Sequence, residues 1–214
     1  MTLARRVICL VVLLVLACQQ PQASVPAIGD SGATQTGSTS GAPAPETQTP
    51  LLAAPTGCTG SPTPAQTEGP YYKAGSPQKA SLREPGMQGT PLVITGYVFT
   101  RSCQPAAGAW LDFWQADARG SYDNSGFRLR GHVFADESGR FIIETIIPGE
   151  YAGRTPHIHV KVRAPNGPVL TTQLYLPNAP GNQRDSIFSP AMVMEVQDVP
   201  GGRAASYNFV LSAG

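Results

Sequence analysis

The chain has 214 residues, with 15 Lys and Arg against 14 Asp and Glu, and its formal net charge is +1 at pH 7. This balance offers no basic surface for a polyanion, so it argues against nucleic-acid binding. Gly and Pro number 23 and 21 and only 14% of residues are charged, a composition that fits a loop-rich β-protein.

The amino terminus has the form of a bacterial lipoprotein signal. Arg5 and Arg6 precede an apolar run over residues 7–17 that is too short to span a bilayer and ends in the sequence VLAC. We therefore expect a signal peptide over residues 1–17, cleavage before Cys18 and lipid modification of Cys18. The mature protein would then be anchored to an exported membrane face, in the periplasm or at the surface of a bacterium. An ordinary secretory signal with an incidental Cys18 is the alternative.

Residues 18–66 are rich in Gln, Ala, Pro, Thr, Ser and Gly, and the only charged residues among them are Asp30 and Glu46. Such a segment buries too little apolar surface to offset the entropy lost on ordering. It predicts a flexible tether that lets a domain over residues 67–214 stand away from the membrane.

Two cysteines remain once Cys9 leaves with the signal and Cys18 takes the lipid. In an oxidising compartment the pair Cys58 and Cys103 predicts a disulfide between the end of the tether and a loop between two early strands. A pair of free thiols is the alternative.

The domain region contains short segments of β-type sequence separated by Gly, Pro, Asn and Asp turns. The candidate strands cover residues 91–99, 109–115, 140–147, 157–163, 168–176, 191–196 and 206–212. Short strands without a helical period predict an all-β fold, an antiparallel β-sandwich in a single domain. Leu111 and Phe113 would face its core, as would Ile142 or Ile143 according to the register.

Polar and apolar residues alternate strictly along residues 157–163. On a strand this places His157 and His159 on one face and sends Ile158, Val160 and Val162 into the core. A strand with a solvated face explains this pattern without any metal, and from the spacing alone that interpretation is favoured.

Two tyrosines stand near these histidines in the sequence. Tyr151 follows Pro148-Gly149 on a predicted turn into the strand, and Tyr122 belongs to a separate loop. Two imidazoles and two phenolates form a hard, anionic ligand set that suits Fe(III). Packed aromatic side chains are the plainer interpretation of the tyrosines, and a zinc or copper site is a weaker option because zinc favours His, Cys and carboxylate ligands.

Four ordered blocks of sequence resemble the intradiol ring-cleavage dioxygenases, the family of catechol and protocatechuate dioxygenases, and are most similar to its short secreted members. The resemblance runs from about Thr67 to about Phe188. The blocks are TEGPYY at 67–72, GAWLDFWQADARGSY at 108–122, GRFIIETIIPGEYAGRTPHIHVKV at 139–162 and TTQLYLP at 171–177.

The resemblance implies that Tyr122, Tyr151, His157 and His159 bind Fe(III), and that Tyr151 leaves the metal and takes a proton when substrate arrives. It also implies catalytic roles for Arg154 and Gln173, and it predicts the sandwich fold. From the residues alone, Arg154 could instead be a surface arginine paired with an acid such as Glu150, and Gln173 a solvated residue on a strand. Tyr71 and Tyr72 either line the substrate pocket or pack the entry to the sandwich.

The expected function is therefore the opening of catechol-type rings between their two hydroxyls with O2, to give muconate-type diacids. The expected partners are a small aromatic diol, O2 and a membrane, together with further copies of the chain, because members of the family form dimers and larger assemblies. The alternative is a non-catalytic β-sandwich binding module that keeps the fold, with or without the metal. Glu150 and His132 favour that alternative, since both depart from the sequence pattern of the family.

Overall fold

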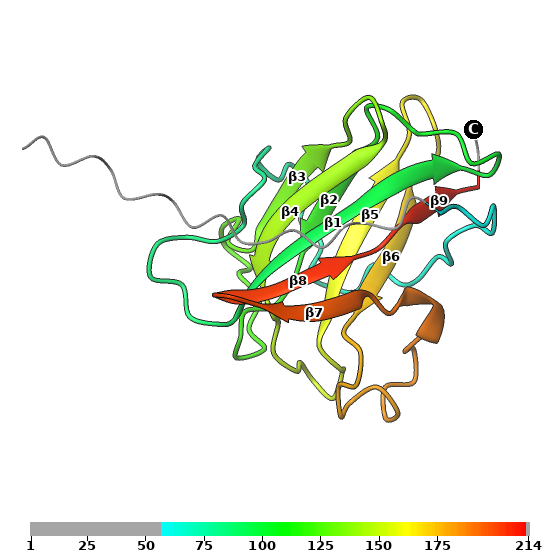
Figure 1. Cartoon of the computed structure of the whole chain (residues 1–214). Helices are drawn as coiled ribbons and strands as arrows, with labels where there is room; N and C mark the ends of the chain where they lie inside the picture. Colours follow the sequence, from blue (N-terminus) through cyan, green and yellow to red (C-terminus); the bar gives the residue numbers. More distant parts are fainter. Residues whose placement is uncertain (1–56, 213–214) are drawn as a thin grey trace, which may run out of the picture. The chain divides into compact units, whose positions relative to one another are not determined.

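A computed structural model describes residues 57–212, which form two β-sheets packed face to face (Figure 1). The strands are β1 (Pro91–Thr100), β2 (Trp110–Trp114), β3 (Arg130–Phe134), β4 (Arg140–Ile146), β5 (His157–Arg163), β6 (Leu170–Tyr175), β7 (Glu195–Val199), β8 (Gly202–Ser206) and β9 (Phe209–Leu211). One sheet has the order β4-β1-β8-β7, with β9 also beside β1, and the other has the order β3-β2-β5-β6. The predicted β-sandwich is confirmed.

Five of the expected strands are found within two residues of their predicted bounds, and the remaining differences have local causes. The sequence Arg-Gly-His-Val-Phe of β3 carries Gly131 and no clear alternation, so β3 was not predicted. Residues 191 and 192, expected at the start of a strand over 191–196, belong instead to the 3-10 helix η1 (Pro190–Met192), which has proline at its first position.

The carboxyl-terminal strand is also divided, and this changes the sheet. The expected strand over residues 206–212 is split between β8 and β9, and both of these strands pair with β1 in parallel. The first sheet is therefore mixed and not purely antiparallel as predicted. The second sheet, which carries the candidate site, is antiparallel throughout.

The core lies between the sheets and follows the predicted alternation. Leu111 and Phe113 are completely buried, and Ile143 is buried whereas Ile142 is only partly covered, which settles the register of β4. From β5, Ile158, Val160 and Val162 enter the core as expected.

The other face of the β3-β2-β5-β6 sheet is covered by residues 57–90, which precede β1 and are called the covering segment below. This chain bonds to both edge strands, since the Gln66 amide donates to the Thr171 carbonyl at 2.9 Å and the Lys79 amide donates to the His132 carbonyl at 3.1 Å. Between them, Tyr72 meets Trp114 edge to face with ring centroids 4.8 Å apart, and a Cβ at Gly69 would lie 3.3 Å from the ring of His159. Residues 57–66, assigned above to the tether, thus lie against the sandwich, and the ordered domain begins before residue 67. His157 and His159 are buried for the same reason, so the solvated-face interpretation is wrong.

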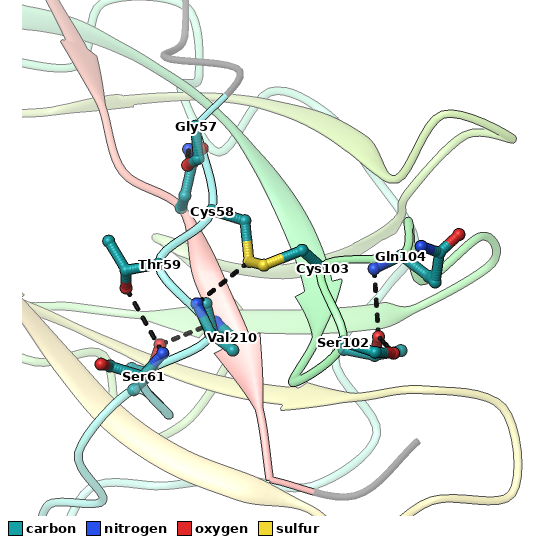
Figure 2. The surroundings of a disulfide bond; sticks show 12 residues. Gly57, Cys58, Thr59, Ser61, Ser102, Cys103, Gln104 and Val210 are labelled. Atoms are coloured by element: carbon teal, nitrogen blue, oxygen red, sulfur yellow. Dashed lines mark hydrogen bonds between the residues drawn. A yellow bond between two sulfur atoms is a disulfide. The ribbon is translucent and has the colours of Figure 1, made fainter.

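The structure contains the expected disulfide. Figure 2 shows Cys58 joined to Cys103 in the loop after β1, with Val210 of β9 beside the bond. The two Cα atoms lie 5.6 Å apart, within the usual range for a disulfide. The bond holds the beginning of the covering segment against the sandwich.

The signal peptide over residues 1–17, the lipid site Cys18 and the tether up to residue 56 lie outside the described residues. Between residues 57 and 212, no helix is long and apolar enough to cross a membrane.

Candidate metal centre

Strand pairing places the predicted site residues in neighbouring rows on the covered face of the second sheet. Trp114 of β2 lies opposite His159 of β5, which lies opposite Gln173 of β6. In the next row along, His157 lies opposite Tyr175. Because directly opposed residues of antiparallel strands have side chains in contact, residues far apart in sequence meet here.

The two histidine rings converge. Their Nε2 atoms are 3.1 Å apart, and both side chains are buried. The carbonyl of Thr155, 2.6 Å from Nδ1 of His157, accepts the hydrogen of that nitrogen, so Nε2 keeps its lone pair. His159 either donates its Nε2 hydrogen to this lone pair or, in its other tautomer, directs a second lone pair at the same point, where a cation can bind both nitrogens.

Burial keeps both imidazoles neutral. It lowers the pKa of His157 to about 4, assisted by the nearby charge of Arg154 and opposed by the bond to Thr155. Burial likewise lowers the pKa of His159 well below its ordinary value, with His157 and Arg154 adding to the effect. Neutral imidazole is the form that binds a metal.

The ring of His159 is held by stacking. It lies on the indole of Trp114 with ring centroids 4.8 Å apart and planes 7° apart. Its Nδ1 is buried and has no hydrogen-bond partner among the described residues. The ring therefore carries one buried nitrogen without a partner and turns the other toward His157.

Two loops bring the phenols to the histidines. The rings of Tyr122 and Tyr151 meet edge to face with centroids 5.4 Å apart, and Tyr122 lies 6.4 Å from His159. All four predicted ligands thus form one cluster. Burial raises the pKa of Tyr122 to about 12, and a hydrogen bond between the Tyr151 and Tyr71 hydroxyls raises the pKa of Tyr151 by stabilising its protonated form, so a metal would have to displace both phenolic protons.

Glycines make the contact between these two loops possible. A Cβ at Gly120, where φ is +80°, would lie 2.0 Å from the carbonyl oxygen of Glu150. A Cβ at Gly149 would lie 2.6 Å from the carbonyl oxygen of Ala118. Only glycine on both sides permits this approach of backbones.

The donor set fits Fe(III): two neutral imidazoles whose Nε2 atoms converge, beside two phenols that become anionic on binding. Within residues 57–212 no group of three or more His, Cys, Asp or Glu side chains could hold a metal. The candidate centre thus consists of His157, His159, Tyr122 and Tyr151, and their role as ligands stays a prediction.

The structure distinguishes the two adjacent tyrosines of the covering segment. Tyr71 stacks on Tyr122 with centroids 4.4 Å apart, and its hydroxyl is 2.5 Å from that of Tyr151. Tyr72 turns elsewhere, with its hydroxyl donating to Asp112 at 3.1 Å. Both line a pocket of about 410 Å³ that Arg130 also borders.

Arg154 and Gln173 belong to one hydrogen-bond network beside the histidines. Arg154 donates from Nη2 to the amide oxygen of Gln173 at 2.7 Å, and from Nε to Asp185 at 2.8 Å. Gln173 is completely buried and donates to the Thr67 carbonyl at 2.8 Å. Two of the alternatives above are therefore wrong: Arg154 pairs with Asp185 and not with Glu150, and Gln173 is buried and does not face solvent.

Sequence reasoning missed three charged groups around the cluster. Arg130 is buried and donates to the carbonyls of Tyr71 and Asp123, which joins the covering segment to the Tyr122 loop. Asp112 and Asp185 are buried carboxylates. The lone acid in the apolar sequence Trp-Leu-Asp-Phe-Trp was a visible signal for Asp112, whereas nothing in the local sequence marks Asp185.

Comparison with known proteins agrees with this geometry. Residues 67–213 match the sequence profile of the family described as Dioxygenase. The chain belongs to the intradiol ring-cleavage dioxygenase family. It is 29% identical to a chlorocatechol 1,2-dioxygenase from Pseudomonas sp. strain P51 over 67% of this chain and 68% of that protein. It is 31% identical to catechol 1,2-dioxygenase 2 from Acinetobacter lwoffii over 59% of this chain and 56% of that protein.

A solved structure extends the similarity to three dimensions. The dioxygenase domain of a dioxygenase and carbohydrate-binding protein fusion from Streptomyces sp. SirexAA-E superposes with a TM-score of 0.71 at 51% identity, covering 72% of this chain and 100% of that chain. The curated catechol 1,2-dioxygenase from Acinetobacter lwoffii is longer, since the chain spans little more than half of it. Family membership thus rests on the sandwich domain.

Proposed function

We propose that the protein is a non-haem Fe(III) intradiol dioxygenase that cleaves catechol-type rings between the two hydroxyls with O2 to give muconate-type diacids. The observation that carries this proposal is the pair of histidine Nε2 atoms 3.1 Å apart, next to the edge-to-face pair of Tyr122 and Tyr151. The related 1,2-dioxygenases for catechol and chlorocatechol support the substrate class.

The protein groups would prepare the metal and the substrate. His157 and His159 would hold the iron as neutral ligands, with Tyr122 and Tyr151 as phenolates. Bound Fe(III) would supply Lewis acidity toward a catechol. The Tyr151 oxygen already has a hydroxyl partner in Tyr71, so it can take a proton from an incoming diol while Tyr71 keeps it oriented.

Arg154 would stabilise negative charge that develops on the ring. Its Nε and Nη2 groups are engaged by Asp185 and Gln173. Its Nη1 amino group has no hydrogen-bond partner among residues 57–212 and would therefore be the one to meet a substrate. A permanently charged donor held in a fixed orientation acts strongly where water is excluded. The rings of Tyr71 and Trp114 cover the cluster and would help to exclude water.

Neither of the two residues that favoured a binding module has a side-chain hydrogen bond to the four candidate ligands among residues 57–212. His132 contacts Ser76, with Nδ1 2.9 Å from the Ser76 carbonyl oxygen, and Glu150 is exposed. A binding module therefore becomes the preferred function only if the following experiment fails.

The test is a visible absorption spectrum of the iron-loaded protein before and after anaerobic addition of catechol. Tyrosinate ligands should give a charge-transfer band that moves to longer wavelength with catechol and disappears when oxygen is admitted. Tyr122→Phe should lose much of the band, and Tyr207→Phe should keep it, because the Tyr207 hydroxyl donates to the Ala191 carbonyl outside the cluster. A colourless wild-type protein with full iron content would contradict the two-tyrosinate site.

The cellular setting is also part of the proposal. The lipoprotein-type signal supports export and anchoring through Cys18, with the active site facing the periplasm or the cell surface. Assembly into homo-oligomers stays a prediction.

A further inference from the structure

Asp185 is a buried acid in the loop between β6 and η1, and both of its oxygens accept hydrogen bonds. Oδ2 accepts from Nε of Arg154 at 2.8 Å and from the Thr155 amide at 3.1 Å, while Oδ1 accepts from the Ile187 amide at 3.1 Å. The side chain has no exposed surface. A buried carboxylate whose two oxygens both accept hydrogen bonds is held in one orientation by its partners.

The first consequence concerns the plane of the Arg154 guanidinium. Asp185 holds the Nε edge, while Gln173 and the Tyr175 hydroxyl lie 2.7 and 3.3 Å from Nη2. Because a guanidinium is planar, holding two of its nitrogens fixes where the third one points. Loss of Asp185 would leave the side chain held at Nη2 alone.

The second consequence concerns His157. Thr155, whose amide is bound by Asp185, accepts the Nδ1 hydrogen of His157 through its carbonyl at 2.6 Å. The Thr155 hydroxyl also donates to Asn182 of the same loop at 2.7 Å. The loop that contains Asp185 therefore supports both the arginine and the histidine.

We propose that Asp185 is a positioning residue of the reaction, which orients the Arg154 guanidinium and, through Thr155, holds His157 in the tautomer with a free Nε2. The catalytic consequence rests on the proposed function, whereas the hold on Arg154 does not. The competing explanation is that Asp185 only anchors its own loop.

The first test measures the hold on Arg154 without iron or turnover. Asp185→Asn in the metal-free protein should make Arg154 react with phenylglyoxal several-fold faster than in wild type, as followed by peptide mass spectrometry, because the guanidinium loses its charged partner. The matched control is Asp136→Asn. Asp136 accepts hydrogen bonds from the backbone amides of Ser138 and Arg140 at 2.9 Å in the β3–β4 turn. The control therefore changes another acid that binds backbone amides in a loop but does not contact Arg154.

The second test is a double-mutant cycle on kcat, with catechol as the probe substrate and iron content measured for each variant. Asp185→Asn should lower kcat about tenfold, as small misplacements of catalytic groups do. Arg154→Lys should lower kcat about 100-fold, and the double variant should lose clearly less than the product of the two single losses, because Asp185 acts in large part through Arg154. Asp136→Asn should leave kcat unchanged.

The outcomes separate this inference from the proposed function. The inference would be overturned if Arg154 in a folded Asp185→Asn protein reacted with phenylglyoxal at the wild-type rate. It would also be overturned if the fold loss of kcat in the double variant equalled the product of the two single losses. An iron-loaded wild type that does not turn over catechol would count against the proposed function, and the labelling rates would still decide whether Asp185 holds Arg154.

Discussion

Gln173 shows how a single residue acquires its role from its partners. It lies on a strand where polar residues often face solvent, yet the covering segment buries it completely. Its amide oxygen accepts from Arg154 and its amide nitrogen donates to the Thr67 carbonyl. It therefore joins the candidate catalytic arginine to the covering segment.

Gln173→Leu should lower the free energy of unfolding by about 2 kcal/mol, because it leaves buried polar partners unsatisfied. Urea denaturation followed by fluorescence would measure the loss. Gln197→Leu, at an exposed position of β7, should change stability by no more than about 0.5 kcal/mol. A Gln173→Leu protein as stable as wild type would show that the network does not hold the segment.

At the scale of elements, the site depends on loops that meet at the end of a rigid sheet. β5 presents both histidines and the Tyr122 and Tyr151 loops approach it, and the loops touch each other through backbone at Gly120 and Gly149. A sheet supplies fixed directions for ligands, whereas loop ligands need a specific contact to stay in place.

Gly120→Ala should separate the two loops. The added Cβ meets the Glu150 carbonyl oxygen in a backbone conformation with positive φ, so we expect a loss of about 2 kcal/mol or more and a weaker charge-transfer band after iron loading. Gly201→Ala is the matched control, since φ there is +83° and nothing lies within 4 Å of the added atom. Equal losses in the two variants would mean that the positive φ alone, and not the loop contact, is responsible.

At the scale of the whole molecule, the segment before β1 connects the sandwich to the predicted membrane anchor. The disulfide closes a separation of 45 residues, for which chain entropy predicts a stabilisation of about 4 kcal/mol. From Cys58 the segment continues over the sheet to Thr67 and Tyr71, which contact the site. Export to an oxidising compartment would therefore favour an ordered active site.

The anchor itself is testable in a bacterial host. Metabolic labelling with a fatty acid should label the wild-type protein, and Cys18→Ala should abolish the label, because the thiol of the mature amino terminus is the acceptor. Equal labelling of both proteins would contradict the lipid anchor at Cys18 and favour an ordinary secretory signal.

Local sequence pattern determined much of this protein. The alternation over residues 157–163 placed three side chains in the core and two histidines on the opposite face, because the side-chain period of a strand is two. The cysteine pairing followed from counting the cysteines and from the predicted export, and the four candidate ligands followed from residue types and family resemblance.

Tertiary structure alone decided the remaining features. It buried the histidine face beneath the covering segment, placed β8 and β9 parallel to β1, and brought Asp185 to Arg154 across 31 residues. A strand's period is set by its own backbone, whereas the partner of a buried charge is set by where distant parts of the chain return. The sequence therefore determined which residues could form the site, and the packing of segments far apart in the chain decided which other residues support it.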